Sequence, residues 1–325
     1  MALSEFELIQ RYFDYQPAAG SRDDVVLGIG DDAAILAVPD DRDLVVCMDT
    51  LVTGVHFPES VTADAIGHKA LAVNLSDLAA MGAEPAWFTL SLTLPDADSQ
   101  WLELFAQGLF ALADRYHVQL VGGDVTRGPL NITVQAHGLV PKGRALKRSG
   151  AAVGDRIYVT GTLGDAGLAL QQGSTASAGL RQRLDYPEPR IDAGLALRGL
   201  VSACIDISDG LLADLGHLLA ADGLGAILQV DDLPRSQDFL ATMETLGDSG
   251  NLSYNVPLSA GDDYELCFTV PPGQGAELES ALAALPGSCT AIGVIEQGGG
   301  LRCQRQDGSI WQPAANGYQH FRAKI

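Results

Sequence analysis

The segment AIGHKALAVNLSDLAAMG, residues 65–82, predicts a helix that is apolar on nearly every side. A helix of this kind is normally buried in the interior of a protein. Segments with strand-like composition flank it, near residues 44–48 and 87–94. Helical and strand periods keep alternating along the rest of the chain, which is typical of an α/β or α+β protein.

The first half of the chain combines two long helices with several strands. Apolar residues recur at 102, 105, 109, 112 and 116, and this spacing of three and four predicts a second helix over about 99–117. Thr62 and Ser99 are the expected N-caps of the two helices. Strands are predicted near residues 25–29, 33–38, 44–48, 87–94, 118–122 and 131–140.

The second half restarts the alternation of strands and helices. Strands are predicted at 156–160, 204–207, 225–230, 264–270 and 289–295, and helices at about 190–202, 209–221, 235–246 and 276–285. The segment 172–189 reads as a loop, for which a lid role is conceivable. We find no internal sequence repeat, although Gly-Asp-Asp occurs twice, at 30–32 and 261–263.

The length of 325 residues predicts two domains, since one domain holds roughly 100–200 residues. We expect an N-terminal domain over 1–140, a linker over 141–155 and a C-terminal α/β domain over 156–325. Residues 141–156 carry five basic side chains and one acid, a local inversion of sign in an acidic chain. This run is either a solvated linker or a clamp for an anion such as a nucleotide.

The composition excludes several classes of protein. Hydrophobic residues make up 47% of the chain, too many for a disordered protein. The net charge of −21 argues against a nucleic-acid binder, and no long uncharged apolar stretch predicts a membrane span. The N-terminus lacks the basic region of a secretory signal. Five cysteines without a Cys-x-x-Cys pair fit reduced thiols in a cytoplasm.

Aspartate accounts for most of the negative charge, with 30 Asp among 41 acidic residues. Asp77 is the most unusual of them, because it falls within the apolar helix, where an unpaired carboxylate is costly. One interpretation is a structural aspartate that hydrogen-bonds to a neighbour such as Asn74, Ser76 or Lys69. The other interpretation is a metal ligand, and the helix by itself does not decide between them.

Other aspartates lie where predicted strands end in glycine-rich turns. Each of them alone is most simply a turn former. Together they place carboxylates at five strand ends, where α/β proteins bind ligands. Short oxygen ligands without His or Cys suit Mg²⁺. These residues are Asp31, Asp32, Asp49, Asp124, Asp206, Asp209, Asp262 and Asp263.

Such an acidic cluster binds a phosphate only when divalent ions intervene, so it predicts a metal-dependent phosphate site. The glycine pairs at 122–123 and 28/30 allow backbone N–H groups to approach an anion. No P-loop or G-x-G-x-x-G motif is present. Ser208-Asp209-Gly210 opens a predicted helix, either as an ordinary N-cap or as a phosphate or metal site. His56 is either a loop histidine or a contact to a substrate phosphate.

Seven segments in this order, together with the C-terminal NGYQHF, resemble the thiamine-monophosphate kinase family. That family belongs to an ATP-binding superfamily with aminoimidazole ribonucleotide synthetase and selenophosphate synthetase. The resemblance covers nearly the whole chain, from about Glu5 onward. The segments are GIGDDAAI (28–35), MDTLVTGVHF (48–57), KALAVNLSDLAAMGAEP (69–85), LVGGDVTRGP (120–129), GRALKRSGA (143–151), IDISDGLLADLGH (205–217) and GDDYELCFTV (261–270).

The resemblance implies an N-terminal mixed sheet with helices that dimerises into a barrel-like interface, and a C-terminal α/β domain. It places the active site between the domains and at the dimer interface. The implied reaction is ATP plus thiamine phosphate to ADP plus thiamine diphosphate, with several Mg²⁺ ions, by direct in-line transfer of the γ-phosphate. No covalent enzyme intermediate and no strong general base are needed, because the attacking phosphate is already ionised near neutral pH.

Residue roles follow from the matching motifs. Metal-bound Asp49, Asp77, Asp124 and Asp209 would carry the catalysis. The implied metal ligands are Asp32, Asp49, Asp77, Asp124, Asp206 and Asp209. ATP would contact Gly123, Asp124, Arg148, Ser208 and Tyr116, and thiamine phosphate would contact His56, Asp262 and Tyr318.

The chain departs from the family pattern at two places. Cys47 and Met48 stand where the family usually has Ser or Thr before Asp49, so a hydroxyl metal ligand is missing. Asp262 stands where the family often has Glu, and its side chain is one methylene shorter.

Two other functions stay open at this point. One is another ATP-dependent synthetase of the same superfamily that acts on a small phosphorylated or amide substrate. The absence of a cysteine before Cys47 disfavours selenophosphate synthetase, and the segment 49–57 disfavours aminoimidazole ribonucleotide synthetase. The other is a non-catalytic nucleotide-binding module, against which the carboxylates at five strand ends argue.

Overall fold

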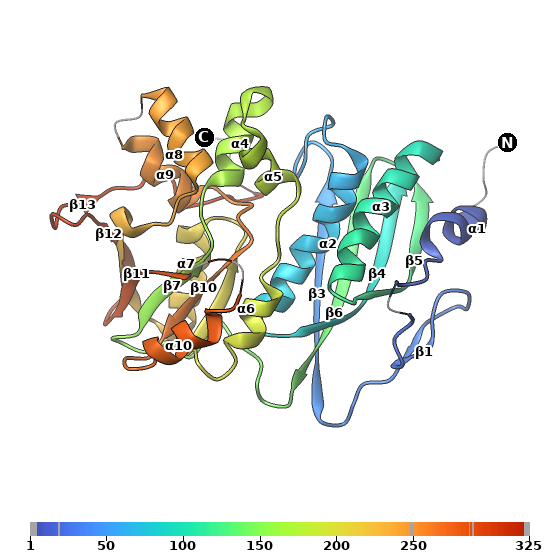
Figure 1. Cartoon of the computed structure of the whole chain (residues 1–325), viewed down its shortest axis with the longest axis horizontal. Coiled ribbons are helices and arrows are strands. Elements are labelled where there is room, and N and C mark those ends of the chain that lie inside the picture. The colour runs from blue at the N-terminus through green and yellow to red at the C-terminus, as the bar shows by residue number, and fades with distance from the viewer. Residues whose placement is uncertain (1–4, 19, 248–249, 286, 288, 322–325) are drawn as a thin grey trace. The chain divides into compact units, whose positions relative to one another are not determined.

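Two units make up the chain in the computed structural model, which describes residues 5–18, 20–247, 250–285, 287 and 289–321 (Figure 1). Unit 1 comprises Met1–Leu78 and Ala83–Gly143, and unit 2 comprises Ala79–Gly82 and Arg144–Ile325. Both contain mixed sheets covered by helices, as the sequence predicts. Within the described residues, no helix is both long enough and apolar enough to cross a lipid bilayer.

Unit 1 is built on a four-stranded sheet in the order β3-β6-β4-β5. Its strands are β3 (Arg42–Val52), β4 (Glu84–Leu94), β5 (Gln119–Arg127) and β6 (Asn131–Pro141). Strands β4 and β5 pair in parallel, and the other two pairings are antiparallel. A small antiparallel hairpin of β1 (Val25–Leu27) and β2 (Ile35–Leu36) is separate from this sheet. The chain starts with α1 (Glu5–Leu8) and the π-helical turn η1 (Ile9–Phe13).

Helices α2 (Ala63–Ala80) and α3 (Ser99–Arg115) lie over one face of this sheet (Figure 1). The three-and-four spacing of α3 buries Leu102, Phe105 and Leu109 completely. The N-cap of α3 is Asp98, whose carboxylate accepts the N–H groups of Gln100 and Trp101. The expectation that Ser99 caps this helix is therefore wrong by one residue.

Two glycines let α2 and α3 approach each other closely. A Cβ atom on Gly67 would lie 2.1 Å from the carbonyl oxygen of Phe105. A Cβ atom on Gly108 would lie 1.9 Å from the carbonyl oxygen of Asp64. Since real side chains do not approach a backbone oxygen so closely, the crossing requires glycine on both helices.

Unit 2 is built on a seven-stranded sheet in the order β13-β12-β9-β11-β7-β10-β8. All its pairings are antiparallel except that of β9 with β12. The strands are β7 (Arg156–Thr160), β8 (Ala203–Ile207), β9 (Gly225–Gln229), β10 (Glu265–Val270), β11 (Cys289–Glu296), β12 (Gly300–Gln304) and β13 (Ile310–Trp311).

The helices of unit 2 are α4 (Asp165–Gln172), α5 (Ala178–Asp185), α6 (Ile191–Ala196), α7 (Leu211–Asp222), α8 (Gln237–Leu246), α9 (Asn251–Ser259) and α10 (Gly275–Leu282). The sequence patterns did not predict two of them, α5 and α9, while α4 is the helix expected after the strand 156–160 and its glycine-rich turn. Two short 3₁₀ turns, η2 (Gly173–Thr175) and η3 (Val230–Asp232), complete the unit. The segment 172–189 is therefore not a loop, since most of it forms η2 and α5.

A buried carboxylate holds this segment to the sheet. Glu265, at the start of β10, is completely buried and accepts a hydrogen bond from Thr160 at 2.6 Å. Arg183 of α5 donates to it at 2.7 Å, and Arg190 donates through both Nε and Nη2, at 2.6 and 2.5 Å. Removing one partner from such a buried ion pair costs about 3–5 kcal/mol, which argues against a mobile lid here.

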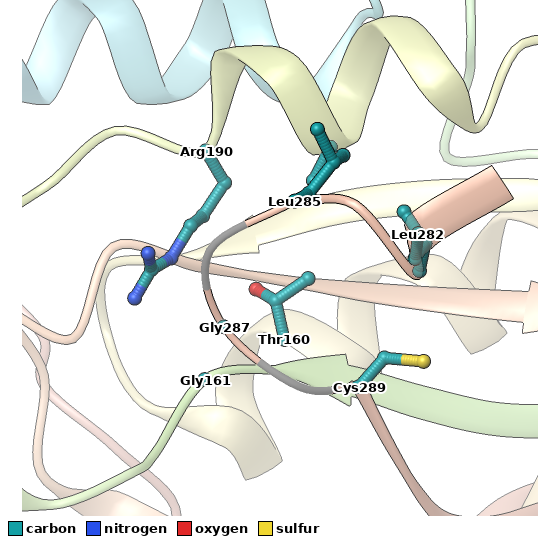
Figure 2. A pocket seen from close by; sticks show the side chains of 8 residues that line it. Thr160, Gly161, Arg190, Leu282, Leu285, Gly287 and Cys289 are labelled. Carbon is teal, nitrogen blue, oxygen red and sulfur yellow. The ribbon is translucent and has the colours of Figure 1, made fainter. Parts of the chain in front are cut away.

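Arg190 and Thr160, which both hydrogen-bond to Glu265, also line a small pocket (Figure 2). Its lining comes from the end of β7, the start of α6 and the chain between α10 and β11, with Leu282, Leu285 and Cys289 among its residues. None of the residues predicted from sequence to bind substrate or metal lines this pocket.

Candidate functional site

In unit 1, two of the predicted metal ligands surround the thiol of Cys47. Cys47 and Asp49 lie on β3, on the face that α2 covers, and Asp77 lies on α2. Burial raises the pKa of the Cys47 thiol, and the charges of Asp77 and Asp49 raise it further. Burial also raises the pKa of Asp49. Asp77 is half-buried rather than buried, so its carboxylate reaches the edge of the core.

Asn74 is a positioning residue in this site, which the sequence suggested only as one possible hydrogen-bond neighbour of Asp77. Its side chain is completely buried, and its Oδ1 accepts the backbone N–H of Asp49 at 3.1 Å. Its Nδ2 donates to the carbonyl oxygen of Ala70, one turn back along α2. The Cys47 thiol donates to the carbonyl oxygen of Asn74 at 3.3 Å. Asn74 thus fixes Asp49 relative to the helix that carries Asp77.

Asp32 lies on an exposed turn between β1 and β2. The hairpin that carries this turn is attached to the sheet through Asp24, which accepts hydrogen bonds from Arg22 at 2.9 Å and from the indole of Trp87 at 2.9 Å. Burial alone would raise the pKa of Asp24, but these hydrogen bonds outweigh it and lower the pKa. The backbone N–H of Asp32 donates to the Asp31 carboxylate at 2.8 Å.

Gly123 and Asp124 lie on β5, at the opposite edge of the sheet from Asp49. Asp124 is level with Ser91 of β4, on the face that α2 and α3 do not cover, and it is exposed. A Cβ atom on Gly123 would lie 1.9 Å from the carbonyl oxygen of Leu90, so this position requires glycine. One copy of unit 1 therefore does not bring Asp49 and Asp124 to a single point.

The two remaining predicted residues of unit 1 have structural contacts of their own. His56 lies in the turn after β3, where its Nδ1 accepts the N–H of Val52 at 3.0 Å. Tyr116 ends α3, with the guanidinium of Arg115 5.3 Å from its ring centroid. His56 thus helps to close the turn that follows Asp49.

In unit 2, three predicted residues lie on the 207–210 loop and the end of β8. Asp206 is buried in β8, and Ser208 and Asp209 follow it before α7 begins. The residue that caps α7 is Gly210, without a side-chain hydrogen bond, so Ser208 is not the ordinary N-cap that its sequence position allows.

Asp214, in the first turn of α7, is a second positioning residue, which the sequence patterns missed. It is buried, and its Oδ2 accepts the N–H groups of Ser208 and Asp209, both at 3.0 Å. Burial, reinforced by the charge of Asp206, raises the pKa of Asp214 to about 7. The N–H groups of Ser208 and Asp209 are therefore already bonded to a carboxylate of the protein itself.

The predicted substrate residues of unit 2 meet the same loop. The N–H of Asp262 donates to the carbonyl oxygen of Ser208, and the N–H of Tyr318 donates to that of Asp209, both at 2.9 Å. Asp262 has a φ of +67°, and its carboxylate accepts a hydrogen bond from the Tyr264 hydroxyl at 2.9 Å. The fold thus brings Asp262 and Tyr318 into contact with the loop of Ser208 and Asp209, from which both are far away in the sequence.

Arg148 is exposed in the basic segment at the start of unit 2. Hydrogen bonds hold its neighbours on both sides. The carbonyl oxygen of Lys147 accepts the N–H of Cys204 at 2.8 Å, and Asp222 accepts the N–H groups of Gly150 and Ala151 at 2.7 and 3.0 Å. The segment is therefore attached to β8 and to the end of α7.

The donor chemistry of these sites fits Mg²⁺. Among the residues that the structure describes, no group of three or more His, Cys, Asp or Glu side chains is arranged to hold a metal ion. The carboxylates occur as pairs instead, Asp49 with Asp77 beside Cys47, and Asp206 with Asp209 beside Asp214. Mg²⁺ is usually held by one or two carboxylates together with water and substrate phosphates, so carboxylate pairs suit it.

Comparisons with known proteins identify the family of the chain. Residues 30–140 match the N-terminal domain of AIR synthase related proteins, and residues 152–306 match their C-terminal domain. The chain is 50% identical over 330 residues to the thiamine-monophosphate kinase of Salmonella typhimurium, and the alignment covers 99% of each chain.

Two solved structures are also similar. The crystal structure of thiamine-monophosphate kinase from Stenotrophomonas maltophilia has a TM-score of 0.83 and 47% identity, and covers 93% of this chain and 97% of that one. The structure of AaThiL complexed with AMPPCP and TMP has a TM-score of 0.76 and 32% identity, and covers 90% and 92% of the two chains. The full-length identity and the two matching domains show that this chain belongs to the thiamine-monophosphate kinase family.

Proposed function

We propose that this protein transfers the γ-phosphate of ATP to thiamine monophosphate, which gives ADP and thiamine diphosphate. The observation that carries the proposal is the 50% identity to a thiamine-monophosphate kinase over nearly the whole chain. The meeting of Ser208, Asp209, Asp262 and Tyr318 at one loop supports it, because residues proposed for ATP and for thiamine phosphate then lie side by side. AaThiL, a relative with the same fold, has been solved with AMPPCP and TMP.

The proposed mechanism is direct attack by the phosphate of the substrate on the γ-phosphate of ATP. That phosphate is ionised near neutral pH, so the chain needs no catalytic base, and its main tasks are to position two anions and to offset their repulsion. Ser208 and Arg148 would hold ATP, with Gly123 and Tyr116 as further contacts. Asp262, Tyr318 and His56 would hold thiamine phosphate, and the Tyr318 ring, which is 46% exposed, is open to stacking on a cationic ring.

Mg²⁺ is the cofactor that we propose for the carboxylates. Asp32, Asp49, Asp77 and Asp124 of unit 1 and Asp206 and Asp209 of unit 2 would hold it. When bound, the ions would neutralise the phosphates and so allow an acidic protein to bind ATP. Asp49 and Asp124 lie at opposite edges of one sheet, which supports more than one ion position rather than a single shared one.

We also propose that the protein is a homodimer that forms through the sheet of unit 1. The face of this sheet opposite to α2 and α3 exposes apolar side chains along β3, with Leu44 45%, Val46 49% and Met48 61% exposed. Three exposed apolar residues on one face of a strand are unusual for a monomer. The unpaired backbone groups of an edge strand can also bind a strand of another chain.

All five cysteines are free thiols, which supports a cytoplasmic location.

The decisive experiment measures ADP release with Mg²⁺, with and without thiamine monophosphate, and again with EDTA. We expect ADP release only when both Mg²⁺ and thiamine monophosphate are present. Asp77→Asn should lower the turnover by about 100-fold or more, since ligand and outer-shell losses at metal sites are commonly this large. Asp40→Asn, which changes an exposed turn, is the control and should keep the wild-type rate. Wild-type turnover in Asp77→Asn would contradict the metal role.

A further inference from the structure

The 207–210 loop is hydrogen-bonded on both sides of its backbone. On the inner side, the buried carboxylate of Asp214 accepts the N–H groups of Ser208 and Asp209, both at 3.0 Å. On the outer side, the carbonyl oxygens of the same two residues accept the N–H groups of Asp262 and Tyr318, both at 2.9 Å. The backbone of two consecutive residues therefore connects one carboxylate to the segments that carry Asp262 and Tyr318.

Glycines leave the loop no room to shift toward these segments. A Cβ atom on Gly261 would lie 2.3 Å from the carbonyl oxygen of Ser208. A Cβ atom on Gly317 would lie 2.8 Å from that of Asp209 and 2.6 Å from the Cβ of Ala213. Because the segments on either side of the loop are in backbone contact with it, a displacement of Ser208 or Asp209 would displace Asp262 and Tyr318 as well.

We propose that Asp214 is a positioning residue that sets the places of both substrates through this loop. It would not touch ATP or thiamine phosphate itself. Its carboxylate holds the N–H groups of Ser208 and Asp209 inward, so that their side chains are presented outward and their carbonyl oxygens align Asp262 and Tyr318. The inference rests on the proposed function, since it assumes that Ser208 binds ATP, that Asp209 binds the metal ion that accompanies ATP, and that Asp262 and Tyr318 bind thiamine phosphate.

Two features of Asp214 favour this role over a merely structural one. One oxygen of this buried side chain, Oδ2, accepts both loop N–H groups, so Ser208 and Asp209 are held by the same atom. The helix that carries Asp214 also starts at Gly210 without any side-chain cap, so the carboxylate serves the loop and not the first turn of α7. A side chain that only stabilised the helix would bond to the N–H groups of that turn.

The test compares Asp214→Asn and Asp214→Ala with the wild-type protein. Asp214→Asn keeps the shape and an oxygen acceptor but removes the charge, and Asp214→Ala removes the acceptor. The dissociation constants of AMPPCP with Mg²⁺ and of thiamine monophosphate are measured separately by calorimetry, together with kcat and both KM values. Asp98→Asn is the matched control, because Asp98 also accepts two backbone N–H groups, but at the N-cap of α3 in unit 1.

We expect both dissociation constants to rise in both Asp214 variants, by about 10–100-fold in Asp214→Ala, as found for partners that orient ligand residues. Asp214→Asn should lie between Asp214→Ala and wild type, and Asp98→Asn should bind both ligands as wild type does. A lower melting temperature with unchanged dissociation constants in Asp214→Asn would overturn the inference, and so would weaker binding of one ligand alone. Should Asp214→Ala not fold, Asp214→Asn still decides.

The same experiment separates this inference from the proposed function. If the wild-type protein neither binds thiamine monophosphate nor converts it with ATP, the proposed function fails. If the wild-type protein does both, and the Asp214 variants match it in binding and in turnover, only the role of Asp214 fails.

Discussion

Individual aspartates in this chain have different roles, and the contacts of each side chain distinguish these roles. Asp49 and Asp77 lie beside the thiol of the half-buried Cys47, and their charges raise its pKa. Asp214 has both of its backbone partners in the adjacent loop. Asp24 instead attaches the β1–β2 hairpin to the sheet through Arg22 and Trp87. The excess of Asp over Glu is consistent with this range, because a short side chain suits local backbone contacts.

The lowered pKa of Asp24 predicts a pH-dependent contribution to stability. A carboxylate with a folded pKa below its unfolded value, about 3.9, stabilises the fold above that pH and loses the effect as the pH falls through the folded pKa. Asp24→Asn should therefore lower the free energy of unfolding by about 1 kcal/mol near pH 7, and by less at about pH 3. Chemical denaturation monitored by tryptophan fluorescence at both pH values measures this difference.

The neighbouring Asp23→Asn is the control for this prediction. Asp23 is exposed, so its substitution should change the free energy of unfolding little at either pH. An equal cost for Asp24→Asn at both pH values would show that the ion pair with Arg22 does not contribute.

At the scale of elements, the crossing of α2 and α3 depends on backbone contact at two glycines. Gly108→Ala would place a Cβ atom 1.9 Å from the carbonyl oxygen of Asp64, and the helices would have to separate. We expect a loss of about 1–3 kcal/mol in the free energy of unfolding, the usual range for overpacking. Thermal unfolding followed by circular dichroism measures the loss.

Gly216→Ala in α7 is the matched control, because a Cβ atom there would meet nothing within 4 Å. Alanine is a better helix former than glycine by about 1 kcal/mol, so this substitution should stabilise the protein. If both substitutions change stability in the same direction, helix propensity rather than the crossing controls the result.

The pattern of elements was predictable where one periodicity dominates a long segment. The spacing of Leu102, Phe105, Leu109 and Leu112 predicted α3, and the structure confirms that all four are buried. Helix α9 (Asn251–Ser259) was missed, since it is short and contains Pro257, a residue that normally interrupts helices. Strands β12 and β13 were missed as well, and β13, only two residues long, is the edge strand next to β12.

At the scale of the whole molecule, the proposed dimer predicts that the exposed face of β3 is covered in solution. Val46→Asp and Met48→Asp place a charge on this face and should convert a dimer into monomers, because a buried unpaired charge is strongly unfavourable. Size-exclusion chromatography with light scattering measures the mass. Leu170→Asp is the control, since Leu170 is exposed to a similar extent (59%) but lies on α4 of unit 2. A wild-type mass of about 34 kDa would contradict the dimer.

The sequence by itself determined the α/β class, the placement of most long elements and the residue types of the site. Periodicity and motif order can be identified in the sequence without knowledge of the fold. Only the tertiary structure decided which of these residues meet. It showed that Asp49 and Asp124 lie at opposite edges of one sheet, while the segments of Asp262 and Tyr318 are hydrogen-bonded to the loop that holds Ser208 and Asp209. It also identified Asn74 and Asp214, because their roles depend on side chains that reach backbone N–H groups of another segment, and such contacts follow from packing in three dimensions.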